Sequence, residues 1–311
     1  MAAIGNDRVL TFDVGGSHVS AAVCYGDYRL GPIARAGHES IETADGFIDL
    51  VTRLGAEATD GFEGGIAATL AVPGPFDLEA GISRMRHKLP YLYGVDLRQS
   101  LAPRFGCRNE EIKFVNDADA YLLGEVGAGA ARGFGRAIGL TLGTGIGSAF
   151  AVDGKVVSDS QGIPKGGEIW NLPFDGATVE DFISARAITA AYARRTGKTS
   201  SAADLAALAS DDAAARAAFA EFGEHLGCVI GTVLAEFNPD VVVLGGGIAR
   251  SSAWFLPALR ARLPREAPEL RIAELDDRAP LAGCGVAWFE DDKGRAPAEM
   301  PASSRTGVAA P

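Results

Sequence analysis

The amino-acid sequence predicts an α/β protein built from two related halves that face each other. Two observations support this prediction. Apolar strand patterns alternate with helical stretches along the chain, and a strand–glycine turn–strand arrangement near the N-terminus occurs again in the middle of the sequence. With 311 residues, the chain is long enough for two domains or one large bilobal one.

The first ordered element is a strand that runs into a glycine turn. Residues 9–14 form the strand, Gly15, Gly16 and Ser17 form the turn, and an alternating segment over residues 18–24 leaves it. Alternation of this kind is typical of a strand, so the turn joins two strands. A dinucleotide-binding glycine loop would open a helix instead, so this turn is of another kind.

Two more strands are expected in the first half. One ends in a Pro-Gly-Pro loop around Gly74, and the other runs to Val115 and is followed by a helix over residues 118–130. Asn116 and Asp117 stand where this strand ends and the helix begins. They fit the ordinary role of a helix N-cap, and also that of a carboxylate base at the strand end where open α/β sheets bind ligands. The helix dipole should keep Asp117 ionised.

A second copy of the hairpin opens the other half. Residues 139–142 form the expected strand, Gly143-Thr144-Gly145 the turn, and residues 147–152 the returning strand. Asp153-Gly154 is a tight hairpin signal that leads into residues 155–157. Each half therefore begins with a hairpin around a glycine turn.

The rest of the second half is predicted to be mainly helical. Helices are expected over residues 179–195 and, in two or three pieces, over residues 201–238. Residues 240–263 predict a strand, a glycine loop and a helix, and residues 271–290 predict a strand, a turn and a helix. The tail over residues 291–311 lacks periodicity and is predicted to be disordered.

Charge and composition exclude several classes of protein. Lys and Arg number 29 against 40 Asp and Glu, so the formal net charge is −11, which disfavours nucleic acid and anionic membranes as partners. No apolar run reaches the ~20 residues of a membrane span, and the N-terminus does not resemble a secretory signal, so a cytoplasmic location is expected. The four cysteines and four histidines lack metal-binding spacing and are interpreted as buried thiols and as structural or surface histidines.

Three glycine turns follow strands, and each is a candidate phosphate-binding loop. The third consists of Gly245, Gly246 and Gly247. Glycine lets backbone N–H groups converge on an anion, although a single such turn is equally typical of an ordinary hairpin. Asp13, beside the first turn, is placed to hold Mg²⁺ directly or through water next to phosphate oxygens.

Several motifs together resemble one family. DVGGSH, VPGPFD, VNDADAYLLGE, LGTGIGSAF, GGEI and VVVLGGGIA stand in the order and spacing of the ROK family of sugar kinases, and LAGCGVAWF resembles its closing helix. The resemblance implies the bilobal actin-like ATPase fold, a duplicated ribonuclease H-like fold with a ligand cleft between the lobes. It also implies an N-terminal lobe over residues 1–117 and a C-terminal lobe over residues 118–290, with the last helix packing back on the first lobe.

The resemblance also implies roles for individual residues. Asp117 matches the catalytic carboxylate. The positions that match the sugar site are Asn116, Glu168, Glu180 and, by its motif, Gly74. The positions that match the nucleotide and phosphate loops are Gly15, Gly16, Ser17 in place of the usual threonine, Thr144, Gly145, Gly245, Gly246 and Gly247. The implied cofactor is ATP with Mg²⁺ near Asp13, and many members of the family form homodimers.

One segment departs from the family pattern. Trp170 and Asn171 stand where members usually have Gly-His, and no cysteine lies between residues 155 and 225, so no zinc site is expected. A shorter turn over residues 172–179 would have to bring Glu180 round instead. Asn171 can replace the histidine as a ligand of sugar hydroxyls. Trp170 is interpreted as a plug in the core or an interface, or else as an aromatic wall against the sugar.

These features predict a glucokinase-like kinase that phosphorylates a hexose or hexose-like sugar. Three alternatives stay open with different weight. A transcriptional regulator would carry a helix-turn-helix before the first strand, and the sequence before Arg8 is too short for one. A non-catalytic sugar sensor would not need Asp117 or three glycine turns. A kinase that uses polyphosphate in place of ATP would share the same motifs.

Overall fold

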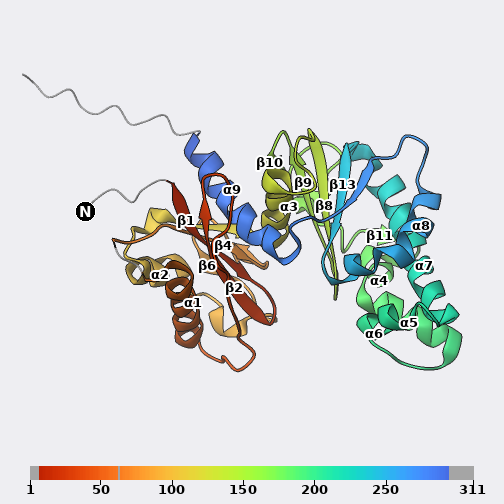
Figure 1. The fold of residues 1–311 in the computed structure, drawn as a ribbon, viewed down its shortest axis with the longest axis horizontal. Coiled ribbons are helices and arrows are strands. Elements are labelled where there is room, and N and C mark those ends of the chain that lie inside the picture. The colour runs from red at the N-terminus through yellow and green to blue at the C-terminus, as the bar shows by residue number, and fades with distance from the viewer. Residues whose placement is uncertain (1–6, 62–63, 294–311) are drawn as a thin grey trace, which may run out of the picture.

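Two five-stranded sheets organise the computed structural model, which describes residues 7–61 and 64–293 (Figure 1). The strands of the first sheet are β1 (Arg8–Val14), β2 (His18–Tyr25), β3 (Ala34–Gly37), β4 (Ala68–Val72) and β7 (Ile112–Asn116). Those of the second are β8 (Arg136–Leu142), β9 (Ile146–Val152), β10 (Lys155–Val156), β13 (Val241–Gly245) and β14 (Glu269–Ile272). Two short hairpins, β5 (Phe76–Asp77) with β6 (Ile82–Ser83) and β11 (Pro173–Phe174) with β12 (Ala177–Thr178), complete the strands described.

The two sheets have the same topology. Their strand orders are β3-β2-β1-β4-β7 and β10-β9-β8-β13-β14. In the first sheet, β1 pairs antiparallel with β2 and parallel with β4. In the second sheet, β8 pairs antiparallel with β9 and parallel with β13. The duplication predicted from the two glycine hairpins is therefore confirmed.

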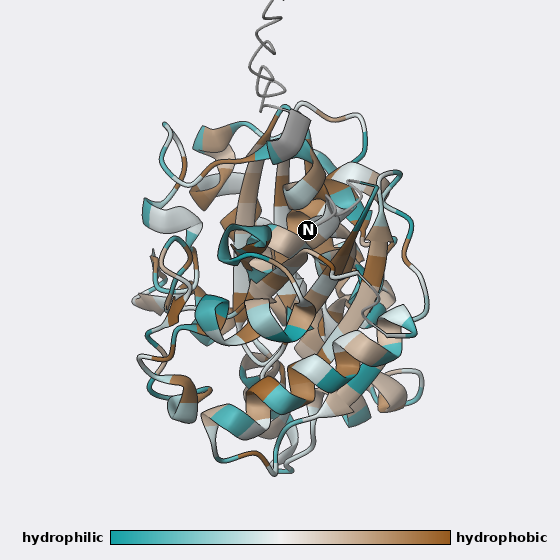
Figure 2. Cartoon of the chain, turned by 90° about the vertical axis from the view of Figure 1, so that its left-hand side faces the viewer, coloured by the Kyte–Doolittle hydropathy of each residue, from teal (hydrophilic) through white to brown (hydrophobic). Residues whose placement is uncertain are grey.

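Helices of the first lobe cover one side of its sheet. They are α1 (Ala44–Thr59) and α2 (Leu97–Phe105). Thr43 caps α1 by accepting a hydrogen bond from the backbone N–H of Gly46, and the helix buries its apolar face, including Phe47 and Leu54, next to β2. Figure 2, which views this lobe, shows hydrophobic residues on the interior strands and hydrophilic residues on the outer turns.

Helices of the second lobe gather beyond its sheet (Figure 1). They are α4 (Val179–Phe182), α5 (Ala185–Thr196), α6 (Ala202–Leu208), α7 (Ala213–Cys228) and α8 (Ser252–Arg262). The single helix expected over residues 179–195 is wrong, because Ser184 leaves the helical conformation and caps α5 by accepting from Ala187. The helical region before Pro239 ends as expected, in a π-turn, a short 3₁₀ turn and Asn238 with φ of 51°.

Two helices lie between the sheets. α3 (Asp117–Ala128) packs on β8 and β9, and α9 (Ala279–Lys293) packs on β1, β2 and β4, while the two helices pack on each other. Glycines permit this close approach: a Cβ on Gly283 would lie 1.7 Å from the carbonyl oxygen of Ala120. The predicted tail begins too early, since residues 291–293 belong to α9, and the rest of it lies outside the described residues.

No helix in the described part of the chain is long and apolar enough to cross a membrane.

Candidate active site

At the junction of β7 and α3, the roles of helix N-cap and candidate base, which the sequence did not assign to separate residues, belong to Asn116 and Asp117 respectively. Asn116 is the N-cap, and its side-chain oxygen accepts hydrogen bonds from the backbone N–H groups of Ala118 at 3.0 Å and Asp119 at 3.4 Å. Asp117 is the first residue of α3 and accepts from Ala118 at 2.9 Å. Because Asn116 already caps the helix, the Asp117 carboxylate is not needed for that purpose.

Burial and the surrounding groups act in opposite directions on the pKa of Asp117. Burial raises the pKa of Asp117, and this effect outweighs the lowering by Lys88 and by the Ala118 hydrogen bond. The backbone N–H groups at the start of α3 thus lower this pKa, but burial has the larger effect. A raised pKa suits a carboxylate that must accept a proton. Lys88 is exposed but close enough to act on this group.

A second carboxylate lies beside Asp117. Asp13 is half-buried in β1, and β1 and β7 flank β4 in the same sheet. Burial, followed by the negative charge of Asp117, raises the pKa of Asp13 to about 7, while Arg35 lowers it. Asp119 adds a third acidic group, whose pKa burial and Asp117 raise to about 6. The three carboxylates thus act on one another's charge, and Asp117 raises the pKa of both Asp13 and Asp119.

The carboxylate pair fits a Mg²⁺ ion that is bound mainly through phosphates. Two like charges near each other in partial burial favour a divalent cation, which would relieve their repulsion. Within residues 7–61 and 64–293, no group of three or more His, Cys, Asp or Glu side chains is arranged to hold a metal ion. Mg²⁺ usually takes one or two carboxylates and completes its shell with phosphate oxygens and water, and Asp13 suits that arrangement.

The first glycine turn is fixed by backbone bonds and a buried histidine. The N–H of Gly15 donates to the carbonyl of His18 at 2.9 Å, and His38 Nε2 donates to the carbonyl of Gly15 at 2.9 Å. His38 is 4% exposed, which fits the structural role predicted for it. Gly16 and Ser17 at the tip are exposed.

The second glycine turn lies against Glu180. Gly143 donates its N–H to the carbonyl of Gly145 at 3.0 Å, and Thr144 at the tip is exposed. Glu180 Oε2 accepts from the N–H of Ile146 at 3.3 Å, and a Cβ on Gly145 would lie 2.1 Å from the same oxygen. A side chain at position 145 would therefore displace the Glu180 carboxylate from this turn, a contact that the sequence did not predict.

The third glycine turn is partly structural. Gly245 ends β13, and a Cβ there would lie 2.1 Å from Tyr121 Oη. Gly246 has φ of 81°, and its Cβ would lie 2.5 Å from the Leu142 carbonyl oxygen. Gly247 alone of the three is exposed.

Each turn contains one glycine that the protein itself does not require. A Cβ at Gly16, Gly143 or Gly247 would meet no atom within 4 Å, and none of the three has a positive φ. Protein packing and backbone strain therefore do not explain these glycines. Close approach of a ligand to the backbone would explain all three.

The segment from Gly166 to Glu180 forms the predicted short turn. Ser148 anchors it to β9 by donating to the carbonyl of Gly167 at 2.6 Å and accepting from Ile169 at 3.2 Å. The N–H of Val179 donates to the carbonyl of Leu172 at 3.0 Å and so closes the turn, with the β11–β12 hairpin at its tip.

A pocket of about 460 Å³ opens at this segment. Its lining residues are Lys165, Gly166, Glu168, Asn171 and Leu172. The structure thus brings Glu168 and Asn171 together, whereas Glu180 lies at the second glycine turn.

Trp170 does not fill the core. Its side chain is 45% exposed, and its indole Nε1 donates to Glu168 Oε2 at 3.1 Å. The interpretation as a core plug is therefore wrong, and Trp170 instead orients a carboxylate of the pocket. Gly74 is exposed, and its missing Cβ would lie 4.0 Å from Asn116 Nδ2, so these two predicted sugar-site residues are neighbours.

Comparisons with known proteins agree with this geometry. The ROK family model matches residues 9–286. An N-acetyl-D-glucosamine kinase of Citrobacter koseri is 27% identical over 310 residues, covering 90% of this chain and 99% of that protein. The crystal structure of a ROK hexokinase from Thermus thermophilus is similar with a TM-score of 0.74 and 25% identity, covering 93% of this chain and 100% of that one. A ROK family glucokinase from Streptomyces griseus, solved with glucose and AMPPNP, shares the fold with a TM-score of 0.71 and 20% identity over 89% of this chain and 98% of that one.

The duplicated sheets, the carboxylate pair and these relatives define a carbohydrate kinase with the actin-like ATPase fold. The chain belongs to the ROK family.

Proposed function

We propose that this chain transfers the γ-phosphoryl group of MgATP to a hydroxyl of a hexose or hexose-like sugar. The observation that carries the proposal is the carboxylate pair Asp13 and Asp117, near the carboxyl ends of β1 and β7, where burial raises both pKa values. Phosphoryl transfer to an alcohol needs a proton acceptor, donors for the phosphates and a metal that spreads charge. The chain offers a candidate for each.

Asp117 accepts the proton of the attacking hydroxyl in this proposal. Its raised pKa makes it a better acceptor than an exposed aspartate, because general-base efficiency grows as the pKa nears the working pH. Asn116 uses its oxygen to cap α3, which leaves its amide N–H groups to donate to a sugar hydroxyl.

The glycine turns hold the phosphates. Backbone N–H groups near Gly16, Gly143 and Gly247 have open space above them, and the exposed hydroxyls of Ser17 and Thr144 can add donors. Asp13 holds the Mg²⁺ ion through one oxygen or through water. When bound, the ion neutralises charge on the phosphate oxygens.

The sugar is bound by the pocket beside Trp170. Glu168 accepts hydrogen bonds from its hydroxyls, and Asn171 can both accept and donate them. Glu180 approaches from the second glycine turn. Leaving these groups unpaired would penalise the wrong sugar. Because a relative is an N-acetyl-D-glucosamine kinase, N-acetylhexosamines should be tested with glucose and mannose.

The experiment is a screen for sugar-dependent ADP release with hexoses, amino sugars and N-acetylhexosamines. Wild type and Asp117→Asn would be assayed with MgATP and, in parallel, with polyphosphate by detecting the phosphorylated sugar. Turnover with ATP in wild type and its loss in Asp117→Asn would support the proposal. Turnover only with polyphosphate would show that polyphosphate, and not ATP, is the phosphoryl donor. Sugar binding without turnover would favour a non-catalytic sugar sensor. The cytoplasmic location and the homodimer stay predictions.

A further inference from the structure

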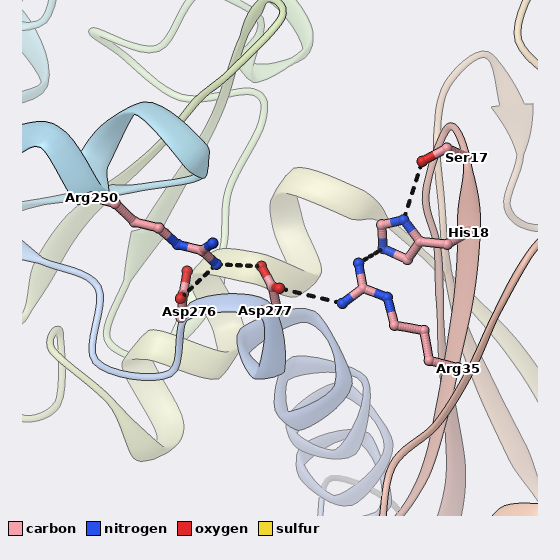
Figure 3. A network of polar contacts seen from close by, with 6 residues as sticks. All are labelled: Ser17, His18, Arg35, Arg250, Asp276 and Asp277. Carbon is pink, nitrogen blue, oxygen red and sulfur yellow. Dashed lines mark hydrogen bonds and ion pairs between the residues drawn. The ribbon is translucent and has the colours of Figure 1, made fainter. Parts of the chain in front are cut away.

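A chain of polar contacts links the first glycine turn to the second lobe (Figure 3). Ser17 Oγ lies 3.3 Å from His18 Nδ1, and His18 Nε2 lies 2.7 Å from Arg35 Nη2. Arg35 Nη1 in turn lies 3.4 Å from a carboxylate oxygen of Asp277. The prediction that His18 is an isolated structural or surface residue is therefore incomplete, because its ring is held on both nitrogens.

The chemistry of these groups determines where the protons are. A guanidinium only donates hydrogen bonds, so His18 Nε2 must accept from Arg35. A neutral imidazole that accepts on Nε2 carries its proton on Nδ1, and Nδ1–H then donates to Ser17 Oγ. Burial and the nearby charges of Arg35 and His38 lower the pKa of His18, which Asp277 raises only in part, so the neutral ring is favoured.

This arrangement fixes Ser17 as a hydrogen-bond donor toward any further partner. Because the Ser17 oxygen accepts a hydrogen bond from the Nδ1–H of His18, the hydroxyl hydrogen of Ser17 is free to donate a hydrogen bond elsewhere. Ser17 is exposed at the tip of the first glycine turn, beside Gly16, where space is open. The hydroxyl is thus prepared to donate to an anionic oxygen.

The far end of the contact chain is anchored to the second lobe. Asp277 also accepts from Arg250 Nη2 at 3.3 Å, and Arg250 binds Asp276 at 2.8 Å. Arg250 follows the third glycine turn in the sequence. The backbone just before Asp276 is fixed by the fully buried Glu125 of α3, which accepts from Leu275 at 2.9 Å.

We propose that Arg35 and His18 are positioning residues for the phosphate donor: they orient the Ser17 hydroxyl toward a donor phosphate, and Asp277 ties Arg35 to the loop that follows the third glycine turn. This inference rests on the proposed use of a nucleotide donor. It assigns Arg35 an action through His18 and Ser17, and no phosphate contact of its own.

The test is a double-mutant cycle on nucleotide binding, which needs no sugar. Ser17→Ala, His18→Phe, Arg35→Ala and the doubles of Ser17→Ala with each of the others would be titrated with Mg²⁺ and AMPPNP by calorimetry. Each single change is expected to weaken binding about tenfold, the loss typical of one hydrogen bond to a charged oxygen. In the Ser17→Ala background, His18→Phe and Arg35→Ala should each change affinity less than about twofold.

Effects that multiply in the doubles would overturn the inference, because Arg35 would then act on phosphate directly or on the fold as a whole. Steady-state assays add a second readout: the KM for ATP should rise in each single variant with kcat little changed. If Arg35→Ala does not fold, the His18→Phe arm decides the test alone.

Arg53→Ala is the matched control, since Arg53 forms an exposed ion pair with Glu57 at 2.9 Å on α1, and its affinity should equal that of wild type. Wild type that fails to bind Mg²⁺ and AMPPNP would overturn the proposed donor together with this inference. Binding by wild type with multiplying effects would overturn this inference alone.

Discussion

The hairpins that open the two lobes have the same strand pairing and different chemistry at their turns. The first turn is one residue longer, since Val14 pairs with Val19 whereas Leu142 pairs with Ile146. Around the first turn, the carboxylate of Asp13 belongs to the strand itself. Around the second, a carboxylate arrives from a distant segment, because Glu180 contacts the turn from the start of α4.

This difference shows how a duplicated backbone can be given two tasks. The first hairpin lies beside Asp117 and connects through His18 to Arg35, so ionisable side chains surround it. The second hairpin has no acidic residue of its own, and the carboxylate at its turn belongs to the segment that also lines the pocket proposed for the sugar. We infer that the first turn serves the transfer step and that the second couples phosphate binding to the sugar.

The strongest test of this comparison is to neutralise, one at a time, the carboxylate of Asp117 beside the first hairpin and that of Glu180 beside the second. Asp117→Asn should lower kcat by about 10²–10⁴-fold, because a general base contributes that much. Glu180→Gln should instead raise the KM for the sugar more than it lowers kcat. Steady-state kinetics of both variants check this. A larger loss of kcat in Glu180→Gln than in Asp117→Asn would contradict the assignment.

The open glycines sharpen the comparison next. Gly16→Ala and Gly143→Ala should each raise the KM for ATP about tenfold or more, since a methyl group would enter the space proposed for phosphate. Their thermal midpoints should match wild type. Gly246→Ala is the contrast: its positive φ and the nearby Leu142 carbonyl should lower the midpoint. Unchanged nucleotide binding in both Gly16→Ala and Gly143→Ala would remove the support that open space gives to the phosphate loops.

Much of the fold was predictable because it depends on local patterns. The glycine hairpins and the strand before Asn116 follow from alternation and turn residues near each other in the chain. The short turn closed by Leu172 and Val179 was expected from the missing zinc segment of the family pattern. The break before α5 was missed because a single serine cap ends a pattern that otherwise reads as one helix.

The site was less predictable because its decisive contacts are long-range. Arg35 and Asp277 lie 242 positions apart, and nothing in either local sequence points to the other. The raised pKa of Asp117 likewise depends on burial, which outweighs the local helix N-terminus. Of the interpretations of Trp170, the core plug failed because a large indole is usually buried and this residue is 45% exposed, while the aromatic wall against the sugar stays a prediction.

A pH profile tests the charge environment of the first lobe. The proposed mechanism requires ionised Asp117, so activity should fall as the pH drops through the raised pKa of the coupled carboxylates. Lys88→Met removes a positive charge that lowers this pKa, so the acid limb should move to higher pH. Lys155→Met, at an exposed lysine on β10, should leave the limb in place. A shift to lower pH in Lys88→Met would contradict the electrostatic coupling.

The smallest effect is expected at the sugar edge of the second lobe. Trp170→Phe keeps the aromatic ring and removes only the N–H that donates to Glu168 at 3.1 Å. Because the side chain is largely exposed, the thermal midpoint should stay within about 1 °C of wild type. The KM for the sugar should rise about threefold to tenfold, as expected for one hydrogen bond that orients a charged group, while the KM for ATP stays constant. An equal rise in both KM values would mean that the segment acts on the whole second lobe, and that the division of tasks between the two hairpins is less sharp than their geometry indicates.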